Sequence, residues 1–265
     1  MKIYMVTDLE GVGGVVRNEQ TTGEGAEYEV ARSLLTKEVN AAIQGALDGG
    51  ADEVLVLDGH GARGAYNFIY EELHPEAEYI MGAPWEVYLP GLDASCHGCF
   101  FVGFHPMAGT RLGVLDHTMS AVAWQQMTIN GTPMGELGLC AAVAGHYDVP
   151  VVLVTGDQAA CDEARALLGE QVETVATKVG LSRNSARMRH PAKVRREIEE
   201  NAKAAMGKIK KVKPLKIAGP VEIRVTYGQT RHADGPKGAG KERVDATTVA
   251  YRGADIIEAV RNLLG

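Results

Sequence analysis

Short apolar runs alternate with amphipathic segments through the first half of the chain. Residues 2–7 (KIYMVT) form an apolar run that predicts a buried strand, and residues 27–50 carry apolar positions at helical spacing before a Gly-Gly stop. Residues 54–57 (VLVL) form a second apolar run. A strand, a helix and a strand in this order make a βαβ unit, so the pattern predicts parallel strands covered by helices.

The same alternation continues with a buried strand at 99–104, a strand and an Asn130-Gly131 turn within 121–135, a helix from about Gly135 and a strand at 149–157. After about residue 170 strands and helices follow in the order β, α, β, β, α: strands at 172–180, 221–227 and 245–251, with helices at 191–209 and 254–264. We therefore expect an α/β fold with a mostly parallel, three-layer sheet in residues 1–169 and a second, smaller α+β lobe in residues 170–265.

Composition narrows the class of protein. The chain has 265 residues, of which 45% are hydrophobic and 23% charged, which suits a globular protein with a large core. Lys and Arg number 27 against 34 Asp and Glu, a net charge of -7. An acidic chain lacks the basic field with which nucleic-acid-binding proteins neutralise phosphates, so we expect a small-molecule or peptide partner and no nucleic acid.

The chain also lacks the signals of a membrane or secreted protein. It contains no apolar run of about 18 residues, and residue 2 leads directly into a strand, so the sequence predicts no membrane segment and a cytoplasmic location. Four cysteines are too few for a disulfide scaffold. The CxxC at Cys96 and Cys99 has no second pair at zinc-ribbon spacing, so buried thiols are expected there.

Two glycine-rich segments resemble phosphate-binding loops but lack essential parts. In residues 235–242 (GPKGAGKE), Glu242 replaces the hydroxyl residue that binds magnesium, and a strand pattern follows where a helix is needed. The segment GVGGVV, from Gly11, lacks the third glycine of the dinucleotide fingerprint. We expect a surface loop at 235–242 and no nucleotide site at either segment.

Acidic and histidine residues follow three predicted strands of the sheet. Asp8 and Glu10 come after the first strand, His60 after the second and His105 after the third. Because ligands bind beyond the carboxyl ends of parallel strands, these side chains are expected to converge, with Asp8 and Glu10 on the same face by strand alternation. Paired carboxylates repel unless one is protonated or a cation lies between them. Carboxylates mixed with imidazoles favour zinc or manganese.

Two further residues could complete such a site. His117 lies in LDHTM, after a glycine-containing loop that could carry it over the same edge, and Glu136 opens the helix GELGLC. Each residue also has a simpler explanation. A carboxylate in the first turn of a helix favours the helix dipole, and a single histidine or acid after a strand is commonly a hydrogen-bonded structural residue or turn former.

Taken together, the motifs TDLEG, DGH, GFH, LDHTM and GELGL occur in an order and spacing that resemble the DppA-type D-aminopeptidases, a family of binuclear zinc peptidases. Further similar segments, such as LSRNSA and TYGQ, extend the resemblance through most of the chain. The resemblance implies that Asp8 bridges two zinc ions, that Glu10, His60, His105 and Glu136 are the other protein ligands, and that His117 is the catalytic histidine. It also implies a large ring-like homo-oligomer, a decamer, that releases N-terminal D-amino acids from short peptides.

One departure from the family pattern concerns the segment before His117. Asp116 stands where a small hydroxyl residue is expected, and the segment between His105 and His117 is one residue longer. A carboxylate next to His117 is expected to raise its pKa or to alter substrate access.

The mechanism expected from these residues is hydrolysis by a zinc-activated bridging water, with His117 transferring a proton or stabilising the oxyanion. Manganese could replace zinc. Two other functions fit the residues alone: a metal-dependent amidohydrolase or phosphoesterase for another small substrate, and a peptide-binding protein with structural metals.

Overall fold

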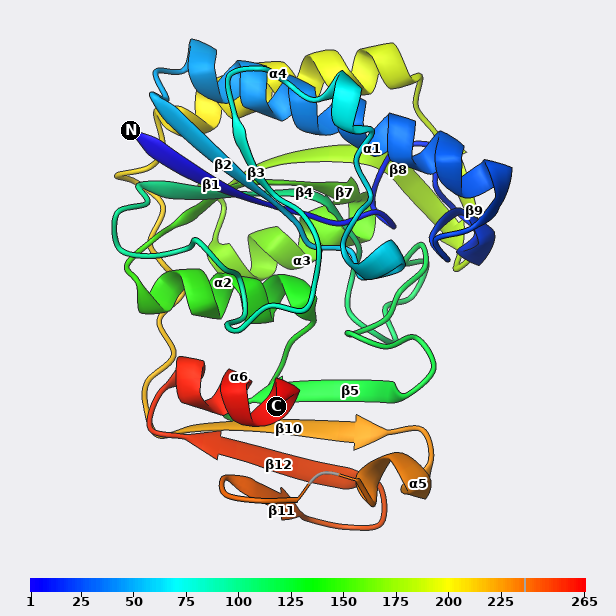
Figure 1. Ribbon diagram of the computed structural model, residues 1–265, viewed down its shortest axis with the longest axis vertical. Helices are drawn as coiled ribbons and strands as arrows, with labels where there is room; N and C mark the ends of the chain where they lie inside the picture. Colours follow the sequence, from blue (N-terminus) through cyan, green and yellow to red (C-terminus); the bar gives the residue numbers. More distant parts are fainter. Residues whose placement is uncertain (236) are drawn as a thin grey trace.

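Two β-sheets and the helices that pack on them make up the fold (Figure 1). The computed structural model describes residues 1–235 and 237–265. The first sheet has seven strands in the order β3-β2-β1-β4-β7-β8-β9, and the second has five in the order β11-β12-β10-β5-β6. The strands of the first sheet are β1 Lys2–Thr7, β2 Glu53–Asp58, β3 Glu78–Ile80, β4 Gly98–Phe104, β7 Val151–Asp157, β8 Glu173–Ser182 and β9 Ser185–Met188.

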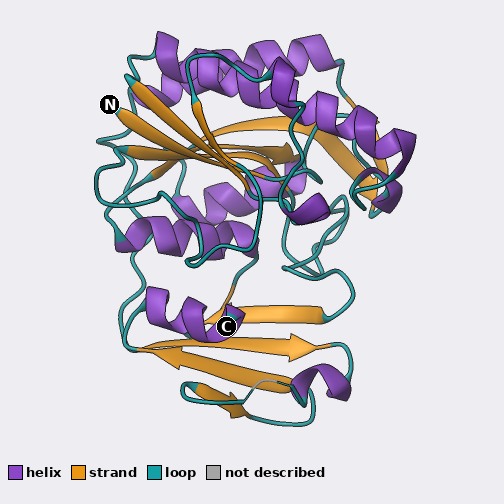
Figure 2. Ribbon diagram, viewed as in Figure 1, coloured by secondary structure: helices purple, strands orange, loops and turns teal. Residues whose placement is uncertain are grey.

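The first sheet is parallel from β3 through β8, and only β9 pairs antiparallel. Figures 1 and 2 show α1 and α4 over one face, and α2 and α3 on the other. These helices span Gly25–Asp48 (α1), Glu136–His146 (α2), Gln158–Leu168 (α3) and Pro191–Met206 (α4). The predicted three-layer α/β arrangement with a mostly parallel sheet is therefore confirmed.

Strand β1 shows why the pattern is an apolar run rather than an alternation. Ile3 and Met5 belong to the core beneath α1 and α4, whereas Tyr4 and Val6 belong to the core on the opposite face. A strand that is covered on both faces buries every side chain, which produces a continuous apolar segment. On the first of these faces α1 crosses α4 closely at Gly45, where a Cβ atom would lie 2.2 Å from the carbonyl oxygen of Glu199.

The second sheet is antiparallel and carries the C-terminal helix α6 (Ile256–Leu264). Its strands are β5 Trp124–Ile129, β6 Thr132–Pro133, β10 Val221–Tyr227, β11 Lys241–Arg243 and β12 Thr248–Gly253. Alternate residues of β10, including Ile223 and Val225, are buried in the core that also contains the side chains of α2. One continuous apolar core therefore joins the second sheet to the lower face of the first.

The expected division at residues 169 and 170 does not coincide with the division between the sheets. Strands β8 and β9 and helix α4 belong to the first sheet, although they follow residue 170, while β5 and β6 precede it and join the second sheet. The reason is that β8 pairs with β7 in parallel, which requires a crossover helix between them. That crossover is α3, a helix that the sequence pattern did not bring out.

The minor elements fall between these larger ones. They are three short 3-10 helices, η1 Asn18–Gln20, η2 Ala62–Gly64 and η3 Tyr70–Glu72, and the one-turn helix α5 Thr230–Ala233. In the glycine-rich segment 235–242, Pro236 lies outside the described residues, and the strand β11 rather than a helix begins at Lys241. Within the described part of the chain no helix combines the length and the apolar character needed to cross a membrane. Cys96 and Cys99 are buried free thiols, as expected.

Helix α1 contains a buried glutamate that should make stability depend on pH. Glu38 is 2% exposed, and its Oε1 accepts a hydrogen bond from the Gly13 amide at 2.9 Å. Burial raises the pKa of Glu38 to about 7 from an ordinary 4.5. The folded protein therefore binds this proton more tightly than the unfolded chain, so stability falls as pH rises from about 4.5 to 7.

We expect Glu38→Gln to remove this decline. From pH 5 to pH 8 the free energy of unfolding of the variant should increase relative to that of the wild type by up to about 3 kcal/mol. Urea unfolding in the presence of a chelator measures both values. Glu200→Gln, at an exposed position of α4, is the control and should follow the wild type. The same pH dependence in all three proteins would contradict the assignment.

Candidate metal centre

The carboxyl ends of three neighbouring strands define the site. Asp8 follows β1, His60 lies two residues after β2, and His105 directly follows β4. Because the sheet order is β2-β1-β4, these ends lie side by side. The expected convergence at this edge of the sheet is therefore present.

Asp8 and Glu10 reach the site by a different route from the one that strand alternation predicts. Strand β1 ends at Thr7, so both acids lie in a turn. Within this turn the Asp8 amide donates to Val102 O at 2.8 Å, and the Gly11 amide donates to Gly103 O at 2.7 Å. A Cβ atom at Gly11 would lie 2.0 Å from the Phe104 carbonyl oxygen. Close packing of this turn on the end of β4, which only glycine permits, directs both carboxylates to one point.

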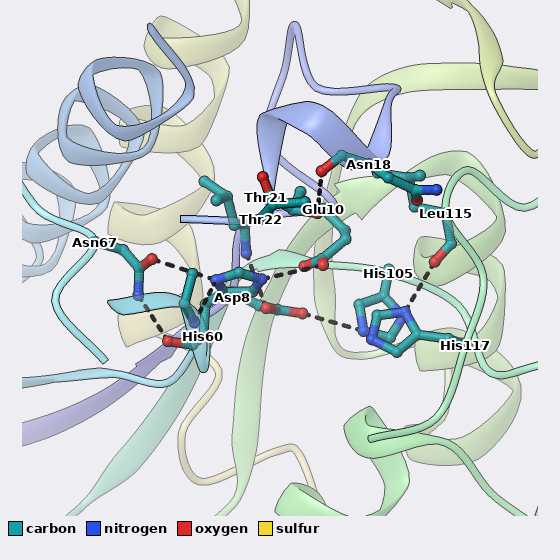
Figure 3. A network of polar contacts seen from close by, with 12 residues as sticks. Asp8, Glu10, Asn18, Thr21, Thr22, His60, Asn67, His105, Leu115 and His117 are labelled. Carbon is teal, nitrogen blue, oxygen red and sulfur yellow. Dashed lines mark hydrogen bonds and ion pairs between the residues drawn. The ribbon is translucent and has the colours of Figure 1, made fainter. Parts of the chain in front are cut away.

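The structure brings all six predicted residues into one cluster. His60 Nε2 lies 3.1 Å from Glu10 Oε1, and His105 Nε2 lies 3.2 Å from Asp8 Oδ2 and 3.3 Å from Glu136 Oε1. His117 Nε2 lies 3.6 Å from Glu136 Oε1, and its ring stacks on that of His105 with 3.9 Å between centroids. In Figure 3, His60 and His105 lie on opposite sides of Asp8.

The ligand atoms fall into two groups that could each hold one ion. Asp8, Glu10 and His60 form one group, and His105, His117 and Glu136 form the other, with the atoms of each group within 4.8 Å of one another. The contact between Asp8 and His105 joins the two groups. The carboxylate of Asp8 therefore lies between the two groups of ligand atoms.

Hydrogen bonds to the backbone fix which ring nitrogen faces the cluster. His105 Nδ1 lies 3.0 Å from Pro106 O, and His117 Nδ1 lies 2.9 Å from Leu115 O. A carbonyl oxygen only accepts, so both Nδ1 atoms carry a hydrogen. When the rings are neutral, they therefore present the lone pair of Nε2 to the cluster, which is the form of histidine that binds metals.

His60 is oriented by a buried asparagine that the sequence did not single out. The Asn67 side-chain amide donates to Asp58 Oδ1 and to His60 O, both at 2.7 Å, so its Oδ1 must face His60 Nδ1 at 3.3 Å. The Ala62 amide is equally close to Nδ1, in a position that would suit the opposite tautomer. A ligating Nε2 requires the tautomer in which Nδ1 donates to Asn67.

The electrostatics of the cluster show how much its groups depend on one another. Burial opposes the charged form of the ring, but the Glu10 carboxylate raises the pKa of His60 to about 10. Burial and the Glu10 charge raise the pKa of Asp8 well above its ordinary value. Burial and the neighbouring His105 lower the pKa of His117, which is therefore neutral at pH 7. Burial opposes the charged form of His105 as well, but Glu136 and Asp8 raise its pKa. Without metal, protons held by the cluster, such as that on His60, compensate the crowded carboxylates.

Divalent cations fit this donor set. Asp8 Oδ2, Glu10 Oε2 and His105 Nε2 are buried and make no well-aligned hydrogen bond among the described residues, although Asp8 Oδ2 and His105 Nε2 lie 3.2 Å apart. Unsatisfied buried carboxylate oxygens are costly, and positive charge at the point where they converge removes the cost. Carboxylates and imidazoles in this mixture suit zinc, and a metal would displace the protons that the cluster otherwise holds.

Asp116 does not raise the pKa of His117, which was one of its two expected effects. Its Oδ2 accepts from the Gly109 amide at 2.8 Å, and its Oδ1 lies 3.4 Å from Arg183 Nε. The pKa of His117 is lowered rather than raised. Asp116 therefore shapes the loop that carries His117, and its charge is directed to Arg183.

A small apolar hollow adjoins the cluster. It has a volume of about 30 Å³, and both Asp8 and Glu136 line it. Leu89, Phe104 and Cys140 supply apolar walls, and the hydroxyl of Tyr88 is occupied by a 3.3 Å contact with Cys140 Sγ. The hollow can hold a small apolar group next to the carboxylates.

Asn67 and Asp58 were missed by the sequence analysis because they have no metal-ligand spacing. Asp58 ends β2 and reads as a turn former, and Asn67 lies in an irregular loop. The one available signal was the position of Asp58 two residues before His60 in DGH, which does not identify the asparagine that connects them.

Replacing Asn67 by alanine should weaken zinc binding about 10- to 100-fold, the usual cost of removing a group that orients a ligating histidine. Competition with a chromogenic chelator measures the affinity. Asn40→Ala is the control, because Asn40 also bridges two segments, through Glu72 O and the His74 amide, but away from the cluster. Equal zinc affinity in both variants would remove the role assigned to Asn67.

Comparisons with known proteins agree with this geometry. The chain matches the Peptidase M55 family, described as D-aminopeptidase, over residues 1–264. It is 37% identical to a D-aminopeptidase of Bacillus subtilis (strain 168) over 269 aligned positions, which cover 100% of this chain and 96% of the relative. Its structure is similar to that of the Zn-dependent D-aminopeptidase DppA from Bacillus subtilis, a self-compartmentalizing protease, with a TM-score of 0.94, 36% identity and the same coverage.

Proposed function

The chain belongs to the D-aminopeptidase family Peptidase M55, and from this premise we propose that it releases N-terminal D-amino acids from short peptides with divalent metal bound at the cluster described above. The observation that carries the proposal is the set of three imidazoles and three carboxylates around buried oxygens that lack partners. A zinc-dependent relative with the same fold supports zinc as the metal.

The arrangement of the ligands supports two ions in each subunit. Glu10 and His60 would hold one ion, His105 and Glu136 the other, and Asp8 would be shared between them. Zinc suits this donor set best, and manganese, which accepts the same donor types, is the second candidate. Ions in these positions would polarise the scissile carbonyl and lower the pKa of a water molecule.

The protein's own residues would then position the peptide and move the proton. His117 is neutral and presents the lone pair of Nε2 towards Glu136, so it can accept a proton as the nucleophile attacks and return it to the leaving amine. The apolar hollow beside Asp8 and Glu136, of about 30 Å³, offers space for a methyl-sized side chain, such as that of an N-terminal alanine.

The self-compartmentalizing relative supports a further part of the proposal, that this chain assembles into a closed homo-oligomer. We propose a ring-like assembly, and specifically a decamer. Light scattering coupled to size exclusion gives its mass directly.

The test of the proposed activity pairs metal analysis with a stereochemical assay. The zinc-loaded protein should hydrolyse D-Ala p-nitroanilide faster than the L-isomer, and should lose this activity in chelator and regain it with added zinc. A phosphate ester is the control substrate, because paired metals also support phosphoryl transfer. Hydrolysis of only the phosphate ester, or of the L-isomer alone, would overturn the proposed function.

A further inference from the structure

A fully buried lysine lies beneath the turn that carries Asp8 and Glu10. Lys178, in β8, has no exposed surface, and it pairs in register with Asp157 of β7. Its Nζ donates to the carbonyl oxygens of Glu10 at 2.5 Å, Val12 at 2.7 Å and Val15 at 2.7 Å. One side chain thus contacts both ends of the segment 10–15.

The geometry requires this lysine to be charged. An ammonium group has three N–H donors and meets three acceptors here, whereas a neutral amine would have only two. Among the described residues no carboxylate lies within ion-pair distance of Nζ, so carbonyl dipoles solvate the charge.

Carbonyl groups that point at a common centre would repel one another without a cation. Segment 10–15 belongs to no helix or strand, and each other hydrogen bond to its backbone holds a single group. The Gly11 amide donates to Gly103 O at 2.7 Å, and Gln20 Nε2 donates to Gly14 O at 2.9 Å. Thr177 Oγ1 donates to Gly11 O at 2.6 Å, and the Gly13 amide donates to Glu38 Oε1 at 2.9 Å. Among the described residues, the Lys178 ammonium is the one group that donates hydrogen bonds to three carbonyl oxygens of this segment, including that of Glu10.

We propose that Lys178 is a positioning residue: a built-in cation that shapes segment 10–15 before any metal arrives and so presets the Glu10 carboxylate for the ion. The inference rests on the proposed metal centre. It implies that the metal does not have to order this segment on binding, which would otherwise reduce the affinity.

The first arm of the test removes the charge but keeps the aliphatic chain. Lys178→Met should bind zinc at least tenfold more weakly than the wild type in chelator competition. Lys208→Met is the matched control, because Lys208 contacts the start of the same strand through a partly exposed ion pair with Glu173 of 2.8 Å. Wild-type affinity in Lys178→Met would overturn the proposal, since a merely space-filling lysine is replaced well by methionine.

The second arm restores the cation without the covalent bond. Lys178→Ala leaves space for the three outer carbons and the nitrogen of the side chain, which correspond to n-propylammonium. This ion, present during purification, should return zinc affinity to within about threefold of the wild type, whereas neutral 1-propanol should not. Equal rescue by both molecules would assign Lys178 to packing alone and overturn its role as a cation.

The third arm uses the wild-type protein and is independent of whether the variants fold. In the metal-free protein the amide hydrogens of Gly11 and Gly13 should exchange slowly, because Lys178 holds the segment while they donate to Gly103 O and Glu38 Oε1. Fast exchange that becomes slow only with zinc would overturn the inference. The proposed function would fail differently, by absence of zinc binding or of D-peptide hydrolysis in the wild type.

Discussion

Replacing Asp8 by alanine should abolish both metal binding and peptide hydrolysis. Among the described residues, Asp8 is the one carboxylate that contacts both groups of ligands, since it belongs with Glu10 and His60 and its Oδ2 lies 3.2 Å from His105 Nε2. Its removal leaves no shared carboxylate between the two positions. If the metals supply several kcal/mol of transition-state stabilisation, hydrolysis should fall about a thousandfold or more. Metal content per subunit and kcat/KM are the measurements.

Asp157→Asn is the matched control for this prediction. Asp157 ends β7 at the same edge of the sheet, but its two oxygens accept hydrogen bonds from the Ala160 and Val114 amides. Its replacement should lower stability and leave the metal content unchanged. Full metal stoichiometry in Asp8→Ala would show that Asp8 does not bridge the ions.

The grouping of the candidate residues could be predicted from the sequence more readily than the membership of the two sheets, and the reason is physical. Parallel strands that are covered on both faces produce apolar runs, and the residues after such runs must lie at one edge of the sheet. Asp8, His60 and His105 could therefore be grouped from the sequence alone. Residues 173–182 lie beyond the expected division at 169 and 170, yet they pair with β7 in the first sheet. Pairing of this kind leaves no local pattern in the sequence when the crossover helix α3 is not recognised.

Other parts of the centre could not be obtained from the pattern at all. Asn67 and Lys178 contact residues of the cluster that are not their neighbours in the sequence. Asn67 lies 7 residues from His60, and Lys178 lies 168 residues from Glu10. Strand alternation predicted that Asp8 and Glu10 converge, and they do, but not for that reason. Glu10 lies in a turn whose shape depends on contacts with β4 and β8. Contacts of this kind carry no periodicity that a single sequence can show.

Replacing His117 by alanine should separate chemistry from metal binding. His117 is neutral, with Nδ1 tied to Leu115 O and Nε2 free to accept a proton, which is the state required of a general base. Its loss should lower kcat by roughly two orders of magnitude or more, with little change in metal content. Because its pKa is lowered, wild-type kcat should decline only below about pH 6.5, and this acidic limb should be missing from the variant.

His146→Ala, at the exposed end of α2, provides the control and should retain wild-type kcat. The metal content of His117→Ala decides between two roles that the geometry allows, since Nε2 of His117 also lies within reach of an ion held by His105 and Glu136. Loss of one ion per subunit would make His117 a ligand and the lost activity a consequence of the missing metal. Full metal content with a low kcat assigns His117 to proton transfer, and unchanged kcat would exclude both roles.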